Sequence, residues 1–278
     1  MVSKHPVTRT VTRSLGLAAA ALALAAAVGC LADSSRVLPG GTLEPDKFLF
    51  DKGTTAIDAR KWLTAREYFK QVVETYTGSV YRPDAKLAVG DTYIGEGTTE
   101  ALVLAINEFT EFLSFYPTNR RADYAQYKLG LAHFKQMRKP ERDQTETRDA
   151  IRELQTFVAR YPNSALLPEV QARLREARDR LSQSDYLVGF FYYRQRWYPG
   201  AVDRFQTILK EDPEFTRRDA VFFHLGESFM KVKREAEALP YYERLLQQFQ
   251  QSEYLDDARK RIGEAKAALE GRAAAAKS

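Results

Sequence analysis

A short pattern recurs five times along this chain and constrains its fold more than any other feature. Each copy pairs a glycine with an alanine twelve to twenty residues later, and a large apolar residue stands four residues after that alanine. The glycines are Gly53, Gly90, Gly130, Gly189 and Gly226; the alanines are Ala65, Ala105, Ala150, Ala201 and Ala238; the large residues are Phe69, Phe109, Leu154, Phe205 and Tyr242. Such self-similarity predicts stacked supersecondary units that build a binding surface.

The spacing within each copy predicts a pair of helices. In copies one, four and five the glycine precedes the alanine by twelve residues, and in every copy a stop position follows the alanine by twelve. Small residues let two helices approach closely where they cross, and proline ends a helix because it has no N–H to donate. The stop positions hold Pro117, Pro162, Pro213, Thr77 and Gln250. We therefore expect an all-α, right-handed superhelical solenoid of five tetratricopeptide-like helical hairpins.

Copies two and three are longer between their two small residues. Gly90 lies fifteen residues before Ala105 and Gly130 lies twenty before Ala150, which predicts longer turns in both copies. The second insertion, residues 137–143, is charged and contains a proline, as is typical of an exposed loop. A polar residue also occupies the fourth position of the first helix in copies two to four, where a bulky apolar residue is usual, so their register stays open. These residues are Lys86, Gln126 and Asp185.

The first residues have the form of an export signal. Basic residues between Lys4 and Arg13 precede an apolar run from Leu15 to Val28. A run of about fourteen residues is too short to span a membrane as a helix but suits a secretory signal. Removal of residues 1–29 would take away three positive charges and no negative one, so the formal net charge would fall from +5 to +2. A nearly balanced mature chain gives no reason to expect nucleic-acid binding.

Cys30, the only cysteine, follows this signal directly. The sequence Ala27-Val28-Gly29-Cys30 resembles the bacterial lipobox, in which the cysteine is acylated and becomes the first residue of the mature chain. We expect Cys30 to carry the lipid, since a lone thiol is unusual in an exported chain. An ordinary secretory cleavage beside a chance cysteine is the alternative. Leu31 follows Cys30, which by analogy with lipoprotein sorting favours the outer membrane.

The expected domain organisation follows from these features. It comprises a lipoprotein signal peptide at 1–29, a tether at 30–45, repeats one to three at 46–164, a connecting helix with repeats four and five at 165–270, and a flexible tail at 271–278.

The connecting helix is predicted to be longer than its neighbours. No strong helix breaker stands between Pro168 and Arg194. Its charged face is interpreted either as a basic contact patch or, more simply, as a solvated face with i,i+4 ion pairs Arg175–Asp179 and Glu176–Arg180. That face holds Arg173, Arg175, Glu176, Arg178, Asp179 and Arg180. We expect this helix to join repeat three to repeat four.

The sequence offers little for catalysis or for a cofactor. His133 and His224 are the histidines beyond the signal, and both fall inside the first helix of a repeat, where a packed histidine is the common state. No metal-ligand spacing, nucleophile elbow or phosphate-binding glycine loop occurs. We therefore predict a chain that is not an enzyme and has no cofactor, metal or nucleic-acid partner.

The first helix of each hairpin is expected to line the inner face of the stack. The aromatic character of this lining suits an extended apolar peptide or the edge of another domain. The alternative is that some of these aromatic residues belong to the core. The predicted peptide groove comprises Phe50, Ile57, Leu87, Ile94, Tyr124, Tyr127 and Phe134, and the predicted partner-docking residues are Tyr186, Phe190, Tyr193 and Phe223.

Three stretches carry a resemblance to a known family. They are Asp-Tyr-Ala-Gln-Tyr-Lys-Leu-Gly-Leu at 123–131, Arg-Asp-Gln at 142–144, and the helix from Ala150 that ends in Tyr-Pro-Asn-Ser at 161–164. With the lipobox, the tether and the five hairpins, the chain resembles the BamD (YfiO or ComL) family of outer-membrane assembly lipoproteins over roughly residues 46–265. One departure is that the first repeat ends Tyr76-Thr77 where the family has Tyr-Pro.

The resemblance implies a non-enzymatic subunit of the machinery that inserts β-barrels into the outer membrane. In that family the C-terminal repeats dock on a BamA-like barrel protein with periplasmic repeats. The N-terminal repeats are implicated in receiving unfolded outer-membrane-protein clients through a C-terminal signal that ends in an aromatic residue. The implied location is the periplasmic face of the outer membrane, through the N-terminal lipid anchor.

Two other classes of protein remain as alternatives. One is a different tetratricopeptide lipoprotein, such as a secretin pilotin or a Tol–Pal accessory protein. The other is the helical solenoid of a lytic transglycosylase, which requires a compact catalytic domain after the repeats, whereas the sequence ends at Ser278.

Overall fold

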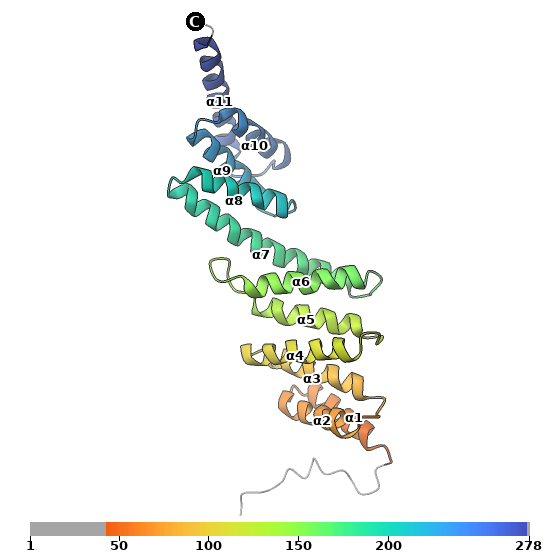
Figure 1. The fold of residues 1–278 in the computed structure, drawn as a ribbon. Helices are drawn as coiled ribbons and strands as arrows, with labels where there is room; N and C mark the ends of the chain where they lie inside the picture. Colours follow the sequence, from red (N-terminus) through yellow and green to blue (C-terminus); the bar gives the residue numbers. More distant parts are fainter. Residues whose placement is uncertain (1–42, 277–278) are drawn as a thin grey trace, which may run out of the picture. The chain divides into compact units, whose positions relative to one another are not determined.

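The computed structural model describes residues 43–276, which fold into helices joined by short connections. This described part contains eleven α-helices and no strand (Figure 1). They are α1 (Pro45–Asp58), α2 (Trp62–Thr75), α3 (Arg82–Glu96), α4 (Thr99–Phe115), α5 (Ala122–Gln136), α6 (Thr145–Arg160), α7 (Leu167–Arg194), α8 (Tyr198–Glu211), α9 (Arg218–Lys231), α10 (Glu235–Gln248) and α11 (Leu255–Ala275). None of these helices combines the length and apolar character needed to cross a membrane. The predicted signal peptide, Cys30 and the tether up to residue 42 lie outside the described residues.

Successive helices pair as five hairpins, from α1–α2 to α9–α10. Within the compact unit Asp46–Ser278, each helix from α2 onward packs mainly on its neighbours in the chain (Figure 1). The helix α1 packs on α2, with 5.4 Å between the ring centroids of Phe50 and Phe69. This confirms the all-α solenoid of tetratricopeptide-like hairpins. The helix α11 adds a layer on α10 and continues to Ala275, so the tail expected from residue 271 is helical as far as that residue.

The five glycines lie where the two helices of each hairpin cross. A Cβ atom on any of them would lie less than 3 Å from the large residue of the same copy. An added Cβ would lie 2.7 Å from a ring carbon of Phe69 at Gly53 and 2.6 Å from a ring carbon of Tyr242 at Gly226. The repeated glycine therefore provides the space that the repeated ring fills, and Ala65 and its counterparts are fully buried beside it.

The second helix of every hairpin ends two residues before its stop position. The helix α4 ends at Phe115 before Pro117, and α2 ends at Thr75 although Thr77 replaces the proline. Proline is common just after a helix C-terminus because it cannot continue the hydrogen-bond ladder. The copies without proline end at the same place, so packing of the next hairpin also determines this boundary.

The tight turn inside four hairpins uses a left-handed residue seven positions after the glycine. These residues are Arg60, Gly97, Arg196 and Lys233, with φ of 55°, 71°, 62° and 59°. The turn of copy two is therefore as short as the others, and the prediction of a longer turn there is wrong. Its extra residues lengthen α4 at its N-terminus, where the Thr98 side chain accepts a hydrogen bond from the backbone N–H of Ala101 (3.1 Å).

Copy three has a true insertion, the loop at residues 137–144. Most of this loop is exposed, as predicted, but its last residue, Gln144, is only 4% exposed. The amide of Gln144 donates to the carbonyl oxygens of Lys139 and Arg142, both at 2.9 Å. The buried amide thus holds the loop against the start of α6.

In copies two and three, the polar residue at the fourth position of the first helix has a polar partner on the second helix. Lys86 of α3 pairs with Glu108 and Glu111 of α4 at 2.5 and 2.6 Å. Gln126 of α5 is 2% exposed and donates to the carboxylate of Glu153 on α6. These polar pairs take the place of the apolar contact that is usual at this position, and the two helices still form a hairpin. The pattern of apolar residues alone therefore could not fix the repeat register in these copies.

Hydrogen bonds between aspartate and serine link three hairpins to the turns that follow them. In each of these Asp–Ser clasps, a serine in the turn after the second helix donates to an aspartate in the first turn of the first helix. The clasps are Ser79–Asp46 (2.6 Å), Ser164–Asp123 (2.6 Å) and Ser252–Asp219 (2.7 Å). The sequence contains a signal for them, because each aspartate precedes its repeat glycine by seven residues.

The long helix α7 belongs to two cores. Its N-terminal half places Val170 and Leu174 against Leu154 and Phe157 of α6, and its C-terminal half places Tyr186 against Phe205 of α8. Asp212, 6% exposed at the end of α8, accepts from Arg175 at 2.5 Å and from Ser182 at 2.6 Å. The helix therefore joins repeat three to repeat four, as its predicted length indicated.

Candidate functional site

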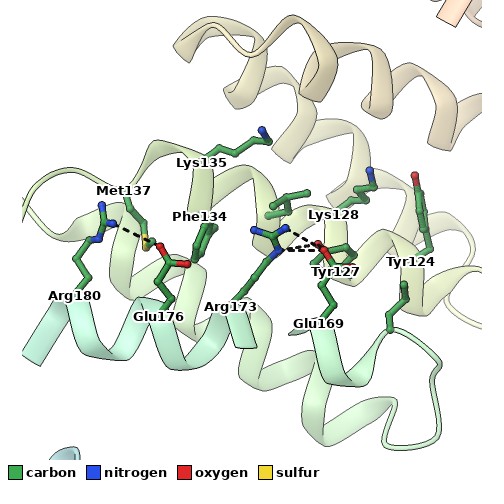
Figure 2. A pocket seen from close by; sticks show the side chains of 12 residues that line it. Tyr124, Tyr127, Lys128, Phe134, Lys135, Met137, Glu169, Arg173, Glu176 and Arg180 are labelled. Atoms are coloured by element: carbon green, nitrogen blue, oxygen red, sulfur yellow. Dashed lines mark hydrogen bonds and ion pairs between the residues drawn. The ribbon is translucent and has the colours of Figure 1, made fainter. Parts of the chain in front are cut away.

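A pocket of about 680 Å³ lies between α5 and the N-terminal half of α7 (Figure 2). Side chains from the two helices point toward one another across it. The helix α5 and the residue after it contribute Tyr124, Tyr127, Lys128, Leu131, Phe134, Lys135 and Met137, and the other wall holds Leu166, Glu169, Arg173, Glu176 and Arg180. On each helix these residues recur at spacings of three or four, so each wall is one helical face.

Tyr127, Glu169 and Arg173 form a hydrogen-bonded group in the middle of the pocket. The hydroxyl of Tyr127 donates to Glu169 Oε1 at 2.5 Å and accepts from Arg173 Nε at 2.9 Å. Burial and the neighbouring Glu169 raise the pKa of Tyr127 to about 12. The hydrogen bonds from Tyr127 and Arg173 lower the pKa of Glu169, so this carboxylate is held in its charged form. These residues are paired with one another and give the pocket a fixed polar wall.

Tyr124 closes one end of the pocket and reaches back to the preceding repeat. Its hydroxyl donates to Asp91 of α3 at 2.8 Å. Burial and the charge of Asp91 raise its pKa, so the hydroxyl stays protonated. The ring lies between two cations, with Arg121 4.6 Å and Lys128 5.0 Å from its centroid. Lys128 also pairs with Asp91 at 3.2 Å, which fixes the lysine at the rim.

The pocket carries more positive than negative charge. Its walls hold four cations, Lys128, Lys135, Arg173 and Arg180, and only the two carboxylates Glu169 and Glu176. Lys135 has no carboxylate partner among the described residues. Arg180 lies 3.6 Å from Glu176, a loose pair at the far end. An apolar wall at Leu131 and Phe134 beside this charge suits a ligand with both an apolar group and an anionic group.

The structure brings together three of the seven predicted groove residues. Tyr124, Tyr127 and Phe134 all line the pocket, whereas the predicted groove residues of repeats one and two do not. Phe50 and Ile57 are half-buried, and Phe50 stacks on Tyr81 with 5.4 Å between ring centroids.

Leu87 and Ile94, the other two predicted groove residues, are 1% and 8% exposed. Both are core residues in this structure, and neither lines the pocket. The helix α3 contacts the next first helix, α5, as well as α2 and α4, and these contacts cover its inner positions.

The predicted docking residues gather around a buried histidine. His224 is 8% exposed, and its ring centroid lies 4.9 Å from Phe190, 5.5 Å from Tyr193 and 5.3 Å from Phe223. Burial lowers the pKa of His224, which keeps the imidazole neutral within this cluster. Tyr186 is 5% exposed and belongs to the core, so its predicted role as a docking surface is wrong. The other three are half-buried.

Different apolar residues are exposed on the C-terminal repeats. Val188, Phe191 and Trp197 are 36%, 56% and 55% exposed. Tyr192 connects them, because its ring lies 6.1 Å from that of Phe191 and 4.6 Å from that of Trp197. We call these four residues the α7–α8 patch. The sequence reasoning missed it because only inner-face positions were considered, although Val188 and Phe191 lie three residues apart outside that set.

The charged face of α7 is divided between two environments. The predicted pairs Arg175–Asp179 and Glu176–Arg180 are present at 3.2 and 3.6 Å. Arg173, Glu176 and Arg180 also line the pocket, with side chains that are 33%, 57% and 32% exposed, so this part of the face is solvated and at the same time forms a pocket wall. The cause is α5, whose side chains lie opposite this part of α7.

Potential metal ligands also come together beside the third hairpin, although the sequence spacing did not predict them. Single ligand atoms of His133, Glu146 and Asp149 lie within 4.8 Å of one another. These three residues do not line the pocket.

Comparison with known proteins places this architecture in one family. The family model described as "YfiO: Outer membrane lipoprotein" matches residues 43–237. An outer membrane protein assembly factor BamD from Caulobacter vibrioides is 26% identical over 79% of this chain and 71% of its own length. The protein of the same name from Vibrio cholerae is 27% identical over 69% of this chain and 81% of its own length.

Among solved structures, the TPR2AB domain of yeast Sti1 is 15% identical, with a TM-score of 0.42, over 83% of this chain and 86% of that one. The family match covers most of the hairpins described above, including α5 and the whole of α7. This chain belongs to the YfiO family of outer membrane lipoproteins.

Proposed function

We propose that this protein is a non-catalytic scaffold of the β-barrel assembly machinery of the outer membrane. Its relatives bear the name outer membrane protein assembly factor, which supports this role over that of a secretin pilotin or a Tol–Pal accessory protein. In this proposal Cys30 carries a lipid that anchors the chain to the periplasmic face of the outer membrane. The N-terminal repeats receive unfolded clients, and the C-terminal repeats dock on a BamA-like barrel protein with periplasmic repeats.

The pocket between α5 and α7 is the observation that carries the client role. A client segment that ends in an aromatic residue presents a ring and a terminal carboxylate close together. Phe134 and Leu131 offer an apolar surface for the ring, and Lys135 is a cation without a carboxylate partner nearby. Charge-assisted hydrogen bonds to a carboxylate are stronger than neutral ones. The combination favours a C-terminal aromatic peptide over an internal apolar segment.

The chemistry of the pocket wall favours recognition of a ligand over catalysis. Tyr127, Glu169 and Arg173 are hydrogen-bonded to one another, and the raised pKa of Tyr127, about 12, leaves its proton in place near neutral pH. Such a wall orients a ligand but does not transfer protons to it. We therefore assign the pocket a recognition role.

A peptide-binding experiment tests the proposal. A fluorescent peptide that ends in phenylalanine with a free carboxylate is titrated with the purified protein, and the same peptide is tested with a C-terminal amide. We expect the amide to bind about tenfold more weakly, because a hydrogen bond to a charged group contributes about 1.5–3 kcal/mol. We expect Lys135→Gln to weaken binding of the free acid but not of the amide.

A matched control separates local from general charge effects. Lys266→Gln removes the same charge from an exposed position on α11, far along the chain from the pocket, and should leave both affinities unchanged. Phe134→Ala should weaken both peptides. Equal binding of acid and amide, or full binding by the Phe134 variant, would contradict the assignment of this pocket.

A further inference from the structure

A histidine and two carboxylates converge at the start of the third hairpin's second helix. His133 lies on α5, and Glu146 and Asp149 lie three residues apart in the first turns of α6. The Nδ1 atom of His133 lies 2.8 Å from Oε2 of Glu146, and one ligand atom from each of the three residues lies within 4.8 Å of the others. The side chains are 11% exposed for His133, 35% for Glu146 and 24% for Asp149. The group is therefore anchored on one side and open to solvent on the other.

The donor set has the composition of a transition-metal site. One imidazole nitrogen and two carboxylate oxygens are a ligand set that Zn²⁺ accepts, with a water completing the tetrahedron. With Zn–N and Zn–O distances of about 2.0–2.2 Å, tetrahedral ligand atoms lie roughly 3.4 Å apart. The distance between His133 Nδ1 and Glu146 Oε2 is 2.8 Å and no pair exceeds 4.8 Å, so the three atoms already lie near the spacing that coordination requires. The hard cations Ca²⁺ and Mg²⁺ prefer all-oxygen sets, and the imidazole argues against them.

Two interactions in the structure compete with a metal ion at this position. His133 and Glu146 share a hydrogen bond, and Arg152 pairs with Asp149. The side chain of Arg152 is 61% exposed, and exposed ion pairs contribute little to stability. A cation between the carboxylates replaces this arginine, and the neutral imidazole binds through Nδ1 with its hydrogen on Nε2.

We propose that His133, Glu146 and Asp149 form a site for a divalent transition-metal ion, with Zn²⁺ as the ion whose ligand preference fits best. The ligands come from both helices of hairpin three, and the loop 137–144 lies between them in the chain. A bound ion ties α5 to α6 where the hairpin has its longest connection. Because α5 forms one wall of the pocket, metal binding stabilises the element that carries the candidate binding residues.

Metal titration of the intact protein tests this proposal. The protein is treated with a chelator, dialysed and titrated with ZnCl₂ by calorimetry, and its thermal unfolding is followed with and without Zn²⁺. We expect one binding event that is absent, or at least tenfold weaker, in Asp149→Asn, Glu146→Gln and His133→Asn. We expect Zn²⁺ to raise the unfolding midpoint of the intact protein and not of these variants.

Controls distinguish the cluster from other zinc ligands. Glu141→Gln and Asp256→Asn remove carboxylates of the same kinds at exposed positions outside the cluster and should bind Zn²⁺ as the intact protein does. Asp149→Asn changes a partly exposed side chain, so it keeps the test valid if His133→Asn fails to fold. The cluster is a hydrogen-bonded pair and not a metal site if the intact protein and Asp149→Asn bind Zn²⁺ equally, or if neither binds it.

Discussion

At the scale of single residues, the pairing of a glycine with a ring is the feature that the sequence predicts best. The signal is local, because glycine, alanine and ring stand at nearly constant spacing within each copy. Every added Cβ would meet the large residue of its own copy, so the pairing follows from one hairpin alone. Burial of inner-face residues was less predictable. Leu87 and Tyr186 are covered by neighbouring hairpins, and that depends on how the hairpins stack.

Filling the space at Gly226 should destabilise the protein. A Cβ there would lie 2.6 Å from Cζ of Tyr242, whose ring is fully buried and whose hydroxyl donates to Glu227 at 2.7 Å. Burial of the ring and the hydrogen bond of its hydroxyl both oppose a shift of the Tyr242 side chain. We expect Gly226→Ala to lower the free energy of unfolding by about 1–3 kcal/mol, as overpacking does in other cores. Urea unfolding followed by circular dichroism measures this.

A glycine-to-alanine substitution at Gly263 should instead stabilise the protein. Gly263 lies within α11, and apart from the adjoining backbone of that helix no atom lies within 4 Å of the position that its Cβ would take. Gly263→Ala should therefore raise the free energy of unfolding by about 0.5–1 kcal/mol through helix propensity alone. If both variants shift stability in the same direction, the close-packing explanation of the repeat glycines is wrong.

At the scale of secondary-structure elements, α7 is the part that departs most from a regular repeat. Its length was predictable, because no breaker stands between Pro168 and Arg194. Its partners were not, because charged residues in the same half of the helix meet different elements, α5 on one side and the end of α8 on the other. Spacing on one helix identifies a face but does not reveal which neighbour covers it. Arg173 in the pocket wall and Arg175 beside Asp212 differ for this reason.

The junction of α7 with α8 should depend on Asp212. This carboxylate is buried and accepts hydrogen bonds from Arg175 and Ser182. Burial opposes its charge, but those two hydrogen bonds outweigh it and hold its pKa below the ordinary value of 3.8. We expect Asp212→Asn to lower the free energy of unfolding by about 1–3 kcal/mol at neutral pH, since buried partners lose a charged acceptor. The control is Glu211→Gln, an exposed neighbour that should have little effect.

The contribution of Asp212 to the free energy of unfolding should decrease as the pH falls. Because the pKa is lower in the folded protein than in the unfolded chain, the contribution of Asp212 is complete above the unfolded value. It is lost as the pH falls through the folded value. The stability difference between the intact protein and Asp212→Asn should therefore shrink as the pH falls from about 5 to about 2. A difference that stays constant over this range would show that Asp212 acts through packing alone.

At the scale of the whole molecule, two surfaces of different chemistry occupy the two ends of α7. The charged pocket involves its N-terminal half, and the α7–α8 patch of Val188, Phe191, Tyr192 and Trp197 involves its C-terminal end. Exposed aromatic residues of this kind are enriched among the residues that dominate protein–protein binding. We therefore expect the patch, rather than the half-buried residues around His224, to contact the proposed barrel partner.

Substitution within the patch should separate the two proposed activities. Phe191→Ala should reduce co-purification of the barrel protein from detergent-solubilised outer membranes at least tenfold, yet leave the affinity for the C-terminal peptide unchanged. Phe115→Ala is the matched control, because it removes an exposed ring from α4; Phe115 is 70% exposed and Phe191 is 56% exposed. If Phe191→Ala recovers as much barrel protein as Phe115→Ala does, the patch is not the docking surface.

The Asp–Ser clasps have a consequence for how such chains diverge. Asp46 and Ser79 are separated by 33 residues, and so are Asp219 and Ser252, and the same atoms meet in both. Each of these segments therefore begins and ends with its own fastening and does not rely on a particular neighbour for it. A segment duplicated or deleted between such boundaries would therefore carry both partners of its own hydrogen bond.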